Sequence, residues 1–167
     1  MDQPILFSTG ECVLGTVLVA RTERGVCAIL LGDDPQELER DLRQRFPHDD
    51  VCNAYVGLEP LVSEVARFLA APGTRLDVPL DLRGSELEMR VWNALREIPP
   101  GTTETYSDVA LRLGAAATAK EVGEACAANP LAVAVPCHRV LRKDGGLGGY
   151  RWGLRRKRAL LERERAA

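Results

Sequence analysis

The residues best suited to chemistry in this sequence are a cysteine and a histidine in the tetrapeptide Pro136-Cys137-His138-Arg139, which follows the apolar run 131–135. A cysteine reacts as its thiolate, and a free thiol with a pKa of about 8.5 is mostly protonated at neutral pH. A histidine accepts that proton well when a carboxylate orients its ring. Adjacent side chains usually diverge, so the dipeptide also fits a buried structural cysteine. Cys137 is therefore a candidate nucleophile that needs support from elsewhere in the chain.

The C-terminal segment from residue 154 supplies a possible carboxylate. Helical spacing places Lys157 and Glu164 on the same face as Leu160 and Leu161. Charged groups on a core-facing stripe are costly unless they are paired, which predicts a polar site beneath this helix. The alternative is a lysine that reaches out to solvent and a glutamate in a frayed last turn.

Composition narrows the class of protein. The chain has 167 residues, 46% of them apolar, and a formal net charge of −2, which suits one globular domain or two small ones. Its five cysteines are an odd number with no Cys-x-x-Cys pair, which argues against a disulfide framework and a zinc ribbon. No apolar stretch approaches the ~20 residues of a membrane span, and no signal-like core opens the chain. We expect a reduced, soluble, cytoplasmic protein that contacts no membrane.

Charge is unevenly distributed along the chain. Residues 1–80 carry 13 acidic and 7 basic side chains, whereas residues 81–167 carry 11 acidic and 15 basic ones. Eight basic residues lie between positions 137 and 158, with Asp144 as the sole acidic residue there. This segment fits a polyanion-binding surface, and it equally fits a solvated arginine-rich face.

Residues 1–80 have the pattern of a small α/β lobe. Apolar, β-branched runs predict strands over 13–20 and 26–31, separated by a turn at 23–25. Helical periodicity predicts helices over 35–46 and 59–69. We expect a small antiparallel sheet with helices, ending near Pro79.

Residues 81–167 are predicted to be mostly helical. Capping boxes Ser85-x-x-Glu88 and Thr118-x-x-Glu121 begin two helices, and Ser107 is expected to cap a third that ends before Gly114. The helices that follow Ser107 and Thr118 have the proportions of a helix-turn-helix, which is expected to be of winged-helix type. Many helical hairpins of this size bind nothing, so the pattern alone does not establish a DNA-binding function.

The helix after Thr118 carries a stripe of small side chains at Ala119, Gly123 and Ala127. Such a stripe lets the backbone approach another helix or a nucleic-acid groove. Lys120 is expected on an exposed side of the same helix.

Taken together, residues 85–164 resemble the catalytic domain of the methylated-DNA–protein-cysteine methyltransferases. The matching motifs are Asn129-Pro130, the run from Ala134 to Val140, and Gly148-Gly149-Tyr150-Arg151-Trp152-Gly153. Val91-Trp92, Ile98-Pro99-x-Gly101 and Thr105-Tyr106 also match in order and spacing. Residues 18–34 resemble the N-terminal lobe that precedes this domain in the Ada branch of the family, so the likeness covers nearly the whole chain.

The resemblance implies a role for each matching residue. Cys137 stands at the alkyl-accepting position, and His138 and Glu164 match the pair that generates its thiolate through a bound water. The other implied residues of the reaction site are Asn129, which braces the turn, Tyr106, which bonds the flipped base and phosphate, and Lys157 near the thiolate. The implied DNA-contacting residues are Ala119, Lys120, Gly123, Tyr106 and Arg139. The implied base pocket consists of Val140, Tyr150, Arg151 and Trp152.

The implied function is direct-reversal DNA repair. An alkyl group would move irreversibly from O(6)-alkylguanine or O(4)-alkylthymine in double-stranded DNA to Cys137, once per molecule, in a monomer that needs no metal and no organic cofactor. One alternative is a lesion-binding protein that recruits other repair factors, although such proteins lack the acceptor cysteine. A Cys/His hydrolase is a further alternative, disfavoured because no oxyanion loop is recognisable.

Lys120, Glu121 and Glu124 depart from the family pattern on the helix expected to bind DNA, and Trp152 stands at a position that varies within the family. Lys120 stands where the family usually has an arginine that fills the space left by the flipped base, and lysine lacks the planar fork of arginine. Glu121 and Glu124 place carboxylates on a helix expected to face phosphates, which should weaken DNA binding. Trp152, where some members carry glycine, is expected to narrow the pocket against bulky substituents, unless it is an ordinary core residue.

Overall fold

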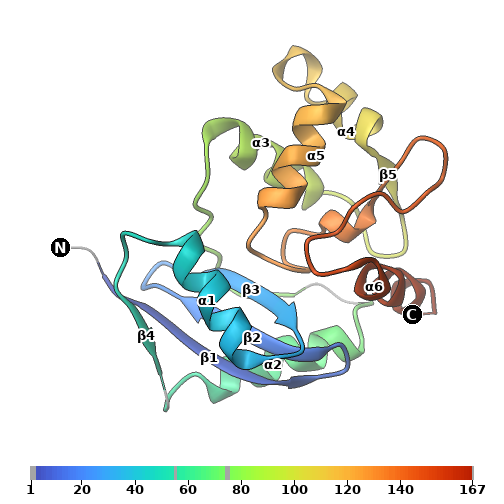
Figure 1. Cartoon of the computed structure of the whole chain (residues 1–167). Helices are drawn as coiled ribbons and strands as arrows, with labels where there is room; N and C mark the ends of the chain where they lie inside the picture. The colour runs from blue at the N-terminus through green and yellow to red at the C-terminus, as the bar shows by residue number, and fades with distance from the viewer. Residues whose placement is uncertain (1–2, 55, 74–75, 167) are drawn as a thin grey trace.

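The computed structural model describes residues 3–54, 56–73 and 76–166. Its N-terminal lobe contains a four-stranded sheet in the order β3-β2-β1-β4 (Figure 1). The strands are β1 (Ile5–Cys12), β2 (Gly15–Arg21), β3 (Val26–Gly32) and β4 (Val51–Asn53). The first three pair antiparallel, whereas β4 lies parallel to β1, so the sheet is mixed rather than purely antiparallel as expected.

The strand bounds correct the sequence-based prediction in two ways. The strand expected over 13–20 begins only at Gly15, because residues 13–14 form the turn of the β1–β2 hairpin and Gly15 has φ +111°. Strands β1 and β4 were not predicted. β4 is only three residues long, and β1 contains the polar segment Ser8-Thr9-Gly10-Glu11, so neither has a clear periodic pattern.

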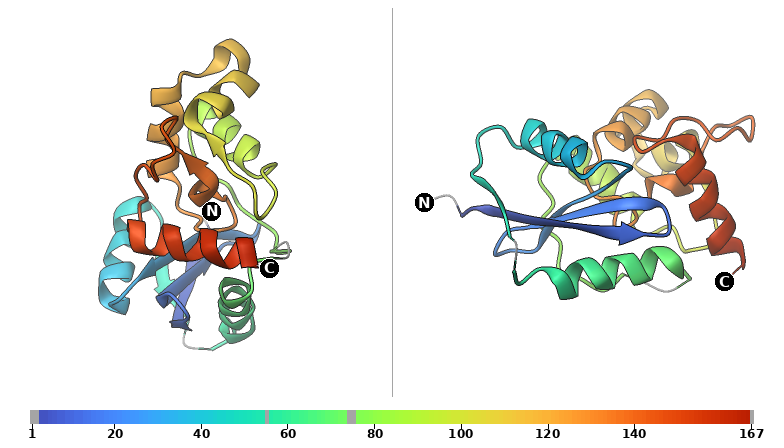
Figure 2. Two further views of the ribbon diagram at one scale, coloured as in Figure 1. Left: turned by 90° about the vertical axis from the view of Figure 1, so that its right-hand side faces the viewer. Right: turned by 60° about the horizontal axis from the view of Figure 1, so that its bottom comes forward.

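Two helices cover opposite faces of the sheet, as Figure 2 shows. Helix α1 (Pro35–Arg45) packs on β3 and β2, and α2 (Glu59–Ala70) packs on β1 and β2. Their apolar faces, with Leu38 and Leu42 on α1 and Val65 and Phe68 on α2, are buried. Both predicted helices of the N-terminal lobe are therefore present.

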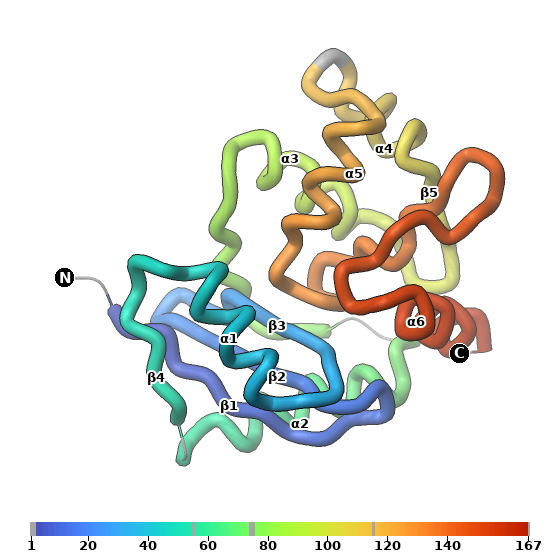
Figure 3. Tube along the Cα trace, in the orientation of Figure 1, coloured from blue at the N-terminus to red at the C-terminus, as the bar shows by residue number. Residues whose placement is uncertain are grey.

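The C-terminal region is helical, with one two-stranded parallel sheet that the sequence analysis did not anticipate. Its helices are α3 (Glu86–Leu95), α4 (Tyr106–Arg112), α5 (Ala119–Ala128) and α6 (Leu154–Ala166). Short 3-10 turns lie at η1 (Gly114–Ala116) and η2 (Cys137–Arg139), and the strands are β5 (Glu104–Thr105) and β6 (Val140–Leu141). The trace in Figure 3 places α4 and α5 side by side, far from the four-stranded sheet.

The predicted capping boxes begin α3 at Ser85 and α5 at Thr118. Helix α4 begins two residues earlier than expected, because Thr105 rather than Ser107 forms the cap with Asp108. This earlier start places Tyr106 in the first turn of α4. The phenol is thereby carried on a helix rather than on a flexible loop.

Backbone pairing joins the sheet to the segment that precedes Cys137. The Ile29 amide on β3 donates to the Pro130 carbonyl (2.9 Å), and the Ala132 amide donates back to Ile29 (3.0 Å). The apolar run 131–135 is thus held against the edge of the sheet, and most of it is fully buried.

Among the described residues, no helix is long and apolar enough to cross a membrane.

The C-terminal region depends on Trp92, whose indole is fully buried and donates to the Ala125 carbonyl on α5 (2.9 Å). We expect Trp92→Phe to lower the free energy of unfolding by about 1–3 kcal/mol, because it leaves a buried carbonyl without a partner. Urea unfolding measures the change. Arg90→Ala, on the exposed side of α3, is the control and should cost no more than about 0.5 kcal/mol. Equal stability of the Phe variant and the unmodified protein would contradict the assigned role of this hydrogen bond.

Candidate active site

Cys137 begins the 3-10 turn η2, and the side chain of Asn129 braces the loop in front of it. The Asn129 amide donates to the carbonyls of Leu131 (3.3 Å) and Val135 (2.9 Å) and to Cys137 Sγ (3.3 Å), while its oxygen accepts from the Leu131 amide (2.8 Å). The loop holds Val133 at φ +60°, a strained conformation for a β-branched residue. A single asparagine, placed as the resemblance implied, thus positions the thiol and stabilises a strained turn.

Behind Cys137 lies a buried cluster of His138, Arg139 and Glu164. His138 Nε2 lies 2.7 Å from Glu164 Oε1, and the Arg139 guanidinium donates to both oxygens of the same carboxylate at 2.7–3.0 Å. Arg139 also donates to the Ile98 carbonyl (2.7 Å) in the turn after α3. All three side chains are almost wholly inaccessible to solvent. The polar site predicted beneath the last helix is therefore present, and Glu164 is paired rather than frayed.

The electrostatics of the cluster determine where its protons reside. Burial favours a protonated Glu164, but hydrogen bonds from His138 and Arg139 outweigh it and lower the pKa of Glu164 to about 2. Burial lowers the pKa of His138 despite the opposing hydrogen bond from Glu164, so the imidazole is neutral at pH 7. An ionised carboxylate only accepts hydrogen bonds, so Nε2 carries the imidazole proton and Nδ1 is left as an acceptor. Nδ1 has no partner among the described residues.

The thiol is protonated when the protein is at rest. Burial raises the pKa of Cys137, and the hydrogen bond from Asn129 and the charge of Lys157 only partly oppose this effect. A thiolate therefore requires a base at the moment of reaction. The neutral His138 is suited to that task.

Lys157 is fully buried on α6 and binds backbone carbonyls. Its ammonium donates to Val140 (2.7 Å), Leu147 and Gly149 (3.2 Å) and lies 6.0 Å from the centre of the Tyr106 ring. The lysine expected near the thiolate thus connects α6 to β6 and to the glycine-rich loop 145–149. The alternative prediction, that Lys157 extends its ammonium into solvent, is wrong.

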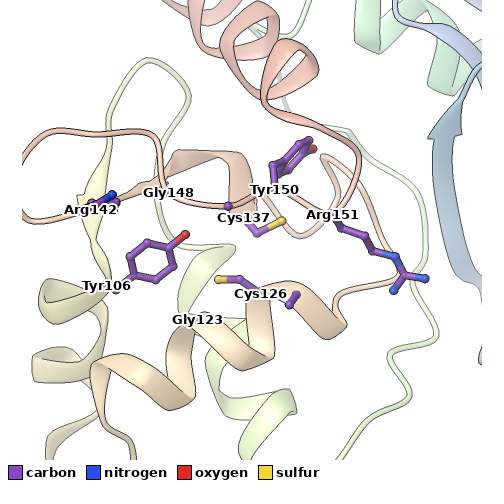
Figure 4. Close-up of a pocket in the computed structure, with 10 residues that line it drawn as sticks. Tyr106, Gly123, Cys126, Cys137, Arg142, Gly148, Tyr150 and Arg151 are labelled. Carbon is purple, nitrogen blue, oxygen red and sulfur yellow. The ribbon is translucent and has the colours of Figure 1, made fainter.

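Cys137 opens into a cavity of about 480 Å³, a size suited to a small organic ligand. Figure 4 shows the sulfurs of Cys137 and Cys126 and the Tyr106 phenol turned toward this shared space. The residues that line it are Tyr106, Gly123, Cys126, Ala127, Cys137, Arg142, Gly148, Gly149, Tyr150 and Arg151. Gly148 has φ +71°, and a β-carbon there would lie 2.8 Å from the Tyr106 hydroxyl, so only glycine fits this wall.

Sequence reasoning missed Cys126 and Arg142 as lining residues. The small-residue stripe on α5 contained the signal for this wall, because Gly123 and Ala127 line the cavity and Cys126 lies between them in sequence. Arg142 lies on a loop without periodicity, and only its place in the basic segment 137–158 could have marked it. It pairs with Asp144 (2.8 Å) and is largely exposed.

Two expected base-pocket residues do not line the cavity. Trp152 is buried behind Tyr150, with the two rings edge-on at 5.2 Å between centroids. Val140 is also buried, and its carbonyl already accepts from Lys157. Trp152 is therefore a core residue, as the alternative interpretation predicted. Its indole lies behind the cavity wall, against Tyr150 and beneath the Arg151 guanidinium.

Arg139 is a further correction. It was expected to contact DNA, but its guanidinium is 7% exposed and paired with Glu164. Lys120, by contrast, is 87% exposed at the start of α5, with Glu124 3.9 Å away. Ala119 and Gly123 are half-buried on the same helix.

Comparison with known proteins shows the family of this chain. The inducible methylated-DNA–protein-cysteine methyltransferase of Bacillus subtilis is 38% identical over 150 residues, which cover 89% of this chain and 84% of that protein. The chain belongs to the methylated-DNA–protein-cysteine methyltransferase family. A model of the family described as "6-O-methylguanine DNA methyltransferase, DNA binding domain" matches residues 86–166 of this family member.

Other relatives extend the likeness of this methyltransferase-family chain to the N-terminal lobe. A crystal structure of Mycobacterium tuberculosis OGT in complex with DNA has a TM-score of 0.79 and 33% identity, covering 96% of this chain and 93% of that one. The Escherichia coli protein named bifunctional transcriptional activator/DNA repair enzyme Ada is 47% identical over 160 residues. The matched region covers 96% of this chain but only 45% of that relative.

The depressed pKa of Glu164 makes the stability of this family member depend on pH. A carboxyl whose pKa falls from its ordinary value of about 4.5 to about 2 contributes stability above pH 4.5 that is lost as the pH falls toward 2. We expect Glu164→Gln to be less stable at pH 7, by about 3–5 kcal/mol, because it leaves Arg139 buried and unpaired. Between pH 5 and 3, its stability should fall less steeply than that of the unmodified protein.

Urea unfolding at a series of pH values tests this expectation. Glu162→Gln, an exposed position on the same helix, should keep the unmodified slope. If Glu164→Gln and the unmodified protein lose stability equally between pH 5 and 3, the carboxylate does not carry the assigned proton linkage.

Proposed function

We propose that this chain repairs alkylated DNA by transferring one alkyl group from O(6)-alkylguanine or O(4)-alkylthymine in a duplex to Cys137. The observation that carries the proposal is the placement of Cys137 between two features. In front is a cavity sized for a base, and behind is a neutral histidine held by a buried carboxylate. The family to which the chain belongs supports the same reaction.

The proposed chemistry begins with proton removal. A water at His138 Nδ1 takes the proton of Cys137, and the imidazole receives a proton from that water, stabilised as imidazolium by the ionised Glu164. Cys137 Sγ then forms a bond to the alkyl carbon while the bond between that carbon and the base oxygen breaks. The electron pair of the broken bond stays on the base, which takes up a proton.

The Tyr106 phenol faces the cavity and is suited to donating a hydrogen bond to the base. Burial raises the pKa of Tyr106 to about 12, which keeps it a neutral donor. The product is a thioether, from which no step regenerates the thiol, so each molecule reacts once. No step requires a metal or an organic cofactor.

We further propose that α4 and α5 act as a helix-turn-helix of winged-helix type that presents this cavity to DNA. Residues 81–167 form the DNA-binding and catalytic lobe, and residues 1–80, whose sheet supports the Cys137 loop, form the second lobe. The half-buried Ala119 and Gly123 allow a close approach of α5, and Lys120 extends from its first turn. The damaged base must rotate out of the helix to reach the thiol.

The expected setting is a monomer acting on double-stranded DNA in the cytoplasm. All five cysteines are free, and four of them are buried or half-buried thiols that the proposed reaction leaves unmodified. A reducing compartment keeps the acceptor thiol available.

The first test identifies the acceptor. After incubation with a duplex containing O(6)-methylguanine, intact-mass analysis should show a gain of one CH₂ per molecule, localised to Cys137 by peptide mapping. Cys137→Ser should show no gain while still binding the duplex, because a hydroxyl is a far weaker nucleophile than a thiolate. Cys126→Ser, which removes the other cavity thiol, should still be alkylated at Cys137.

Two results would contradict this assignment. A methyl adduct on Cys126 that persists in Cys137→Ser would show that Cys126, rather than Cys137, is the acceptor. Lesion binding without any adduct in the unmodified protein would favour a recruiting role instead.

The second test concerns Lys120. If its side chain supports the space left by the flipped base, Lys120→Ala should slow transfer from duplex DNA by about tenfold or more, since the extrahelical base costs a few kcal/mol. Transfer from the free base should be unchanged, and Lys120→Arg should match or exceed the unmodified protein on duplex DNA. Single-turnover rates on both substrates measure this, and equal losses on both would exclude Lys120 from the flipping step.

A further inference from the structure

Two buried side-chain polar atoms lack a hydrogen-bond partner among the described residues, and both belong to residues beside the acceptor thiol. They are His138 Nδ1 and the Tyr150 hydroxyl. Buried polar groups without partners are rare and costly, and they recur where a site holds a water or reacting group. The reaction proposed above uses His138 Nδ1. It does not use the Tyr150 hydroxyl.

The position of Tyr150 connects it to the acceptor. Its ring lines the cavity with Cys137, and Figure 4 shows its hydroxyl turned away from Tyr106 and Cys126. The ring packs edge-on against Trp152, which fixes its orientation. The hydroxyl is therefore not directed toward the part of the cavity where Tyr106 would meet a base.

Both ends of the proton relay influence the phenol. Burial raises the pKa of Tyr150 well above its ordinary value, a Cys137 thiolate and the Glu164 carboxylate raise it further, and the charge of Arg156 opposes them. Arg139 and Lys157 act on His138 from the other elements packed around it. The phenol is thus neutral throughout the working pH range and able both to donate and to accept a hydrogen bond.

We propose that Tyr150 is a positioning residue of the proton relay, whose hydroxyl holds, together with His138 Nδ1, the water that receives the Cys137 proton. This inference rests on the function proposed above. A buried water typically makes about three hydrogen bonds, and Cys137, His138 and Tyr150 supply three partners. Water held by a histidine alone would be free to turn its acceptor lone pair away from the thiol. The phenol fixes that orientation.

Tyr150→Phe removes only the hydroxyl and keeps the ring that packs on Trp152. We expect duplex affinity and thermal stability to be retained, and methyl transfer at pH 7 to slow by about tenfold, as for the loss of one oriented hydrogen bond. The rise of the transfer rate with pH should move upward by about one unit, because tenfold less thiolate corresponds to one pKa unit. In a His138→Ala background the same substitution should have little further effect, since the water has already lost its acceptor.

A matched control is Glu162→Gln, which removes a charge at an exposed position of α6 and leaves the relay unchanged. Its pH profile should coincide with that of the unmodified protein. A Tyr150→Phe variant with the unmodified rate and pH profile would overturn the inference, as would a profile shifted equally by Glu162→Gln. A high-resolution crystal structure gives an independent check: a water shared by Tyr150 and His138 supports the proposal, and the absence of any shared water overturns it.

Iodoacetamide labelling of Cys137 without DNA separates this inference from the proposed function. Labelling at Cys137, followed by peptide mapping across a pH series, reports thiolate formation alone. A shifted labelling profile in Tyr150→Phe supports the relay role even if the unmodified protein transfers no methyl group. An unshifted profile overturns the relay role even if methyl transfer is intact.

Discussion

The buried carboxylate of Glu164 is the interaction on which the rest of the site depends. It lies near the end of the last helix, yet it bonds two residues of η2, 25 and 26 positions earlier in the chain. Through Arg139 the same cluster also reaches Ile98, in the turn that follows α3. A buried charge of this kind is tolerated only when its partners are in place, so the cluster requires α6, η2 and α3 to meet in one arrangement. That requirement orients His138 and leaves its second nitrogen free to act as a base.

The N-terminal lobe contributes position rather than chemistry. No side chain of the four-stranded sheet lines the cavity, but the outer edge of β3 pairs with residues 130–132, shortly before Cys137. Asn129 completes this support from inside the loop. The proposed in-line attack on an alkyl carbon requires a rigidly held thiol, because small displacements cost large factors in rate. The strained Val133 is consistent with a loop held by its surroundings rather than by its own preference.

Lys157 and Gly148 together define the wall of the cavity opposite α5. The lysine holds the loop through the carbonyls of Leu147 and Gly149 and binds β6 through that of Val140. The glycine allows the loop backbone to pass against the Tyr106 hydroxyl. Neither residue reacts, but both decide how wide the cavity is. Tyr150 and Trp152 complete this side by edge-on packing, so the size of the cavity depends on a layer of side chains behind its surface.

The sequence by itself determined the parts of this protein that rest on local physics. Capping boxes located α3 and α5, helical periodicity located α1 and α2, and the spacing of Lys157, Leu160 and Glu164 revealed a polar site under α6. The motif around Cys137 was sufficient to indicate the family, and it marked Cys137 as the candidate nucleophile. Tertiary structure decided what depends on partners distant in sequence. Three such features have no local signature in the sequence. They are the pairing of Arg139 with a carboxylate rather than DNA, the packing of Trp152 behind Tyr150 rather than in the pocket, and the parallel direction of β4 beside β1. An arginine has the same intrinsic preferences in either role, and only the arrival of Glu164 from the far end of the chain makes the buried position the more stable one.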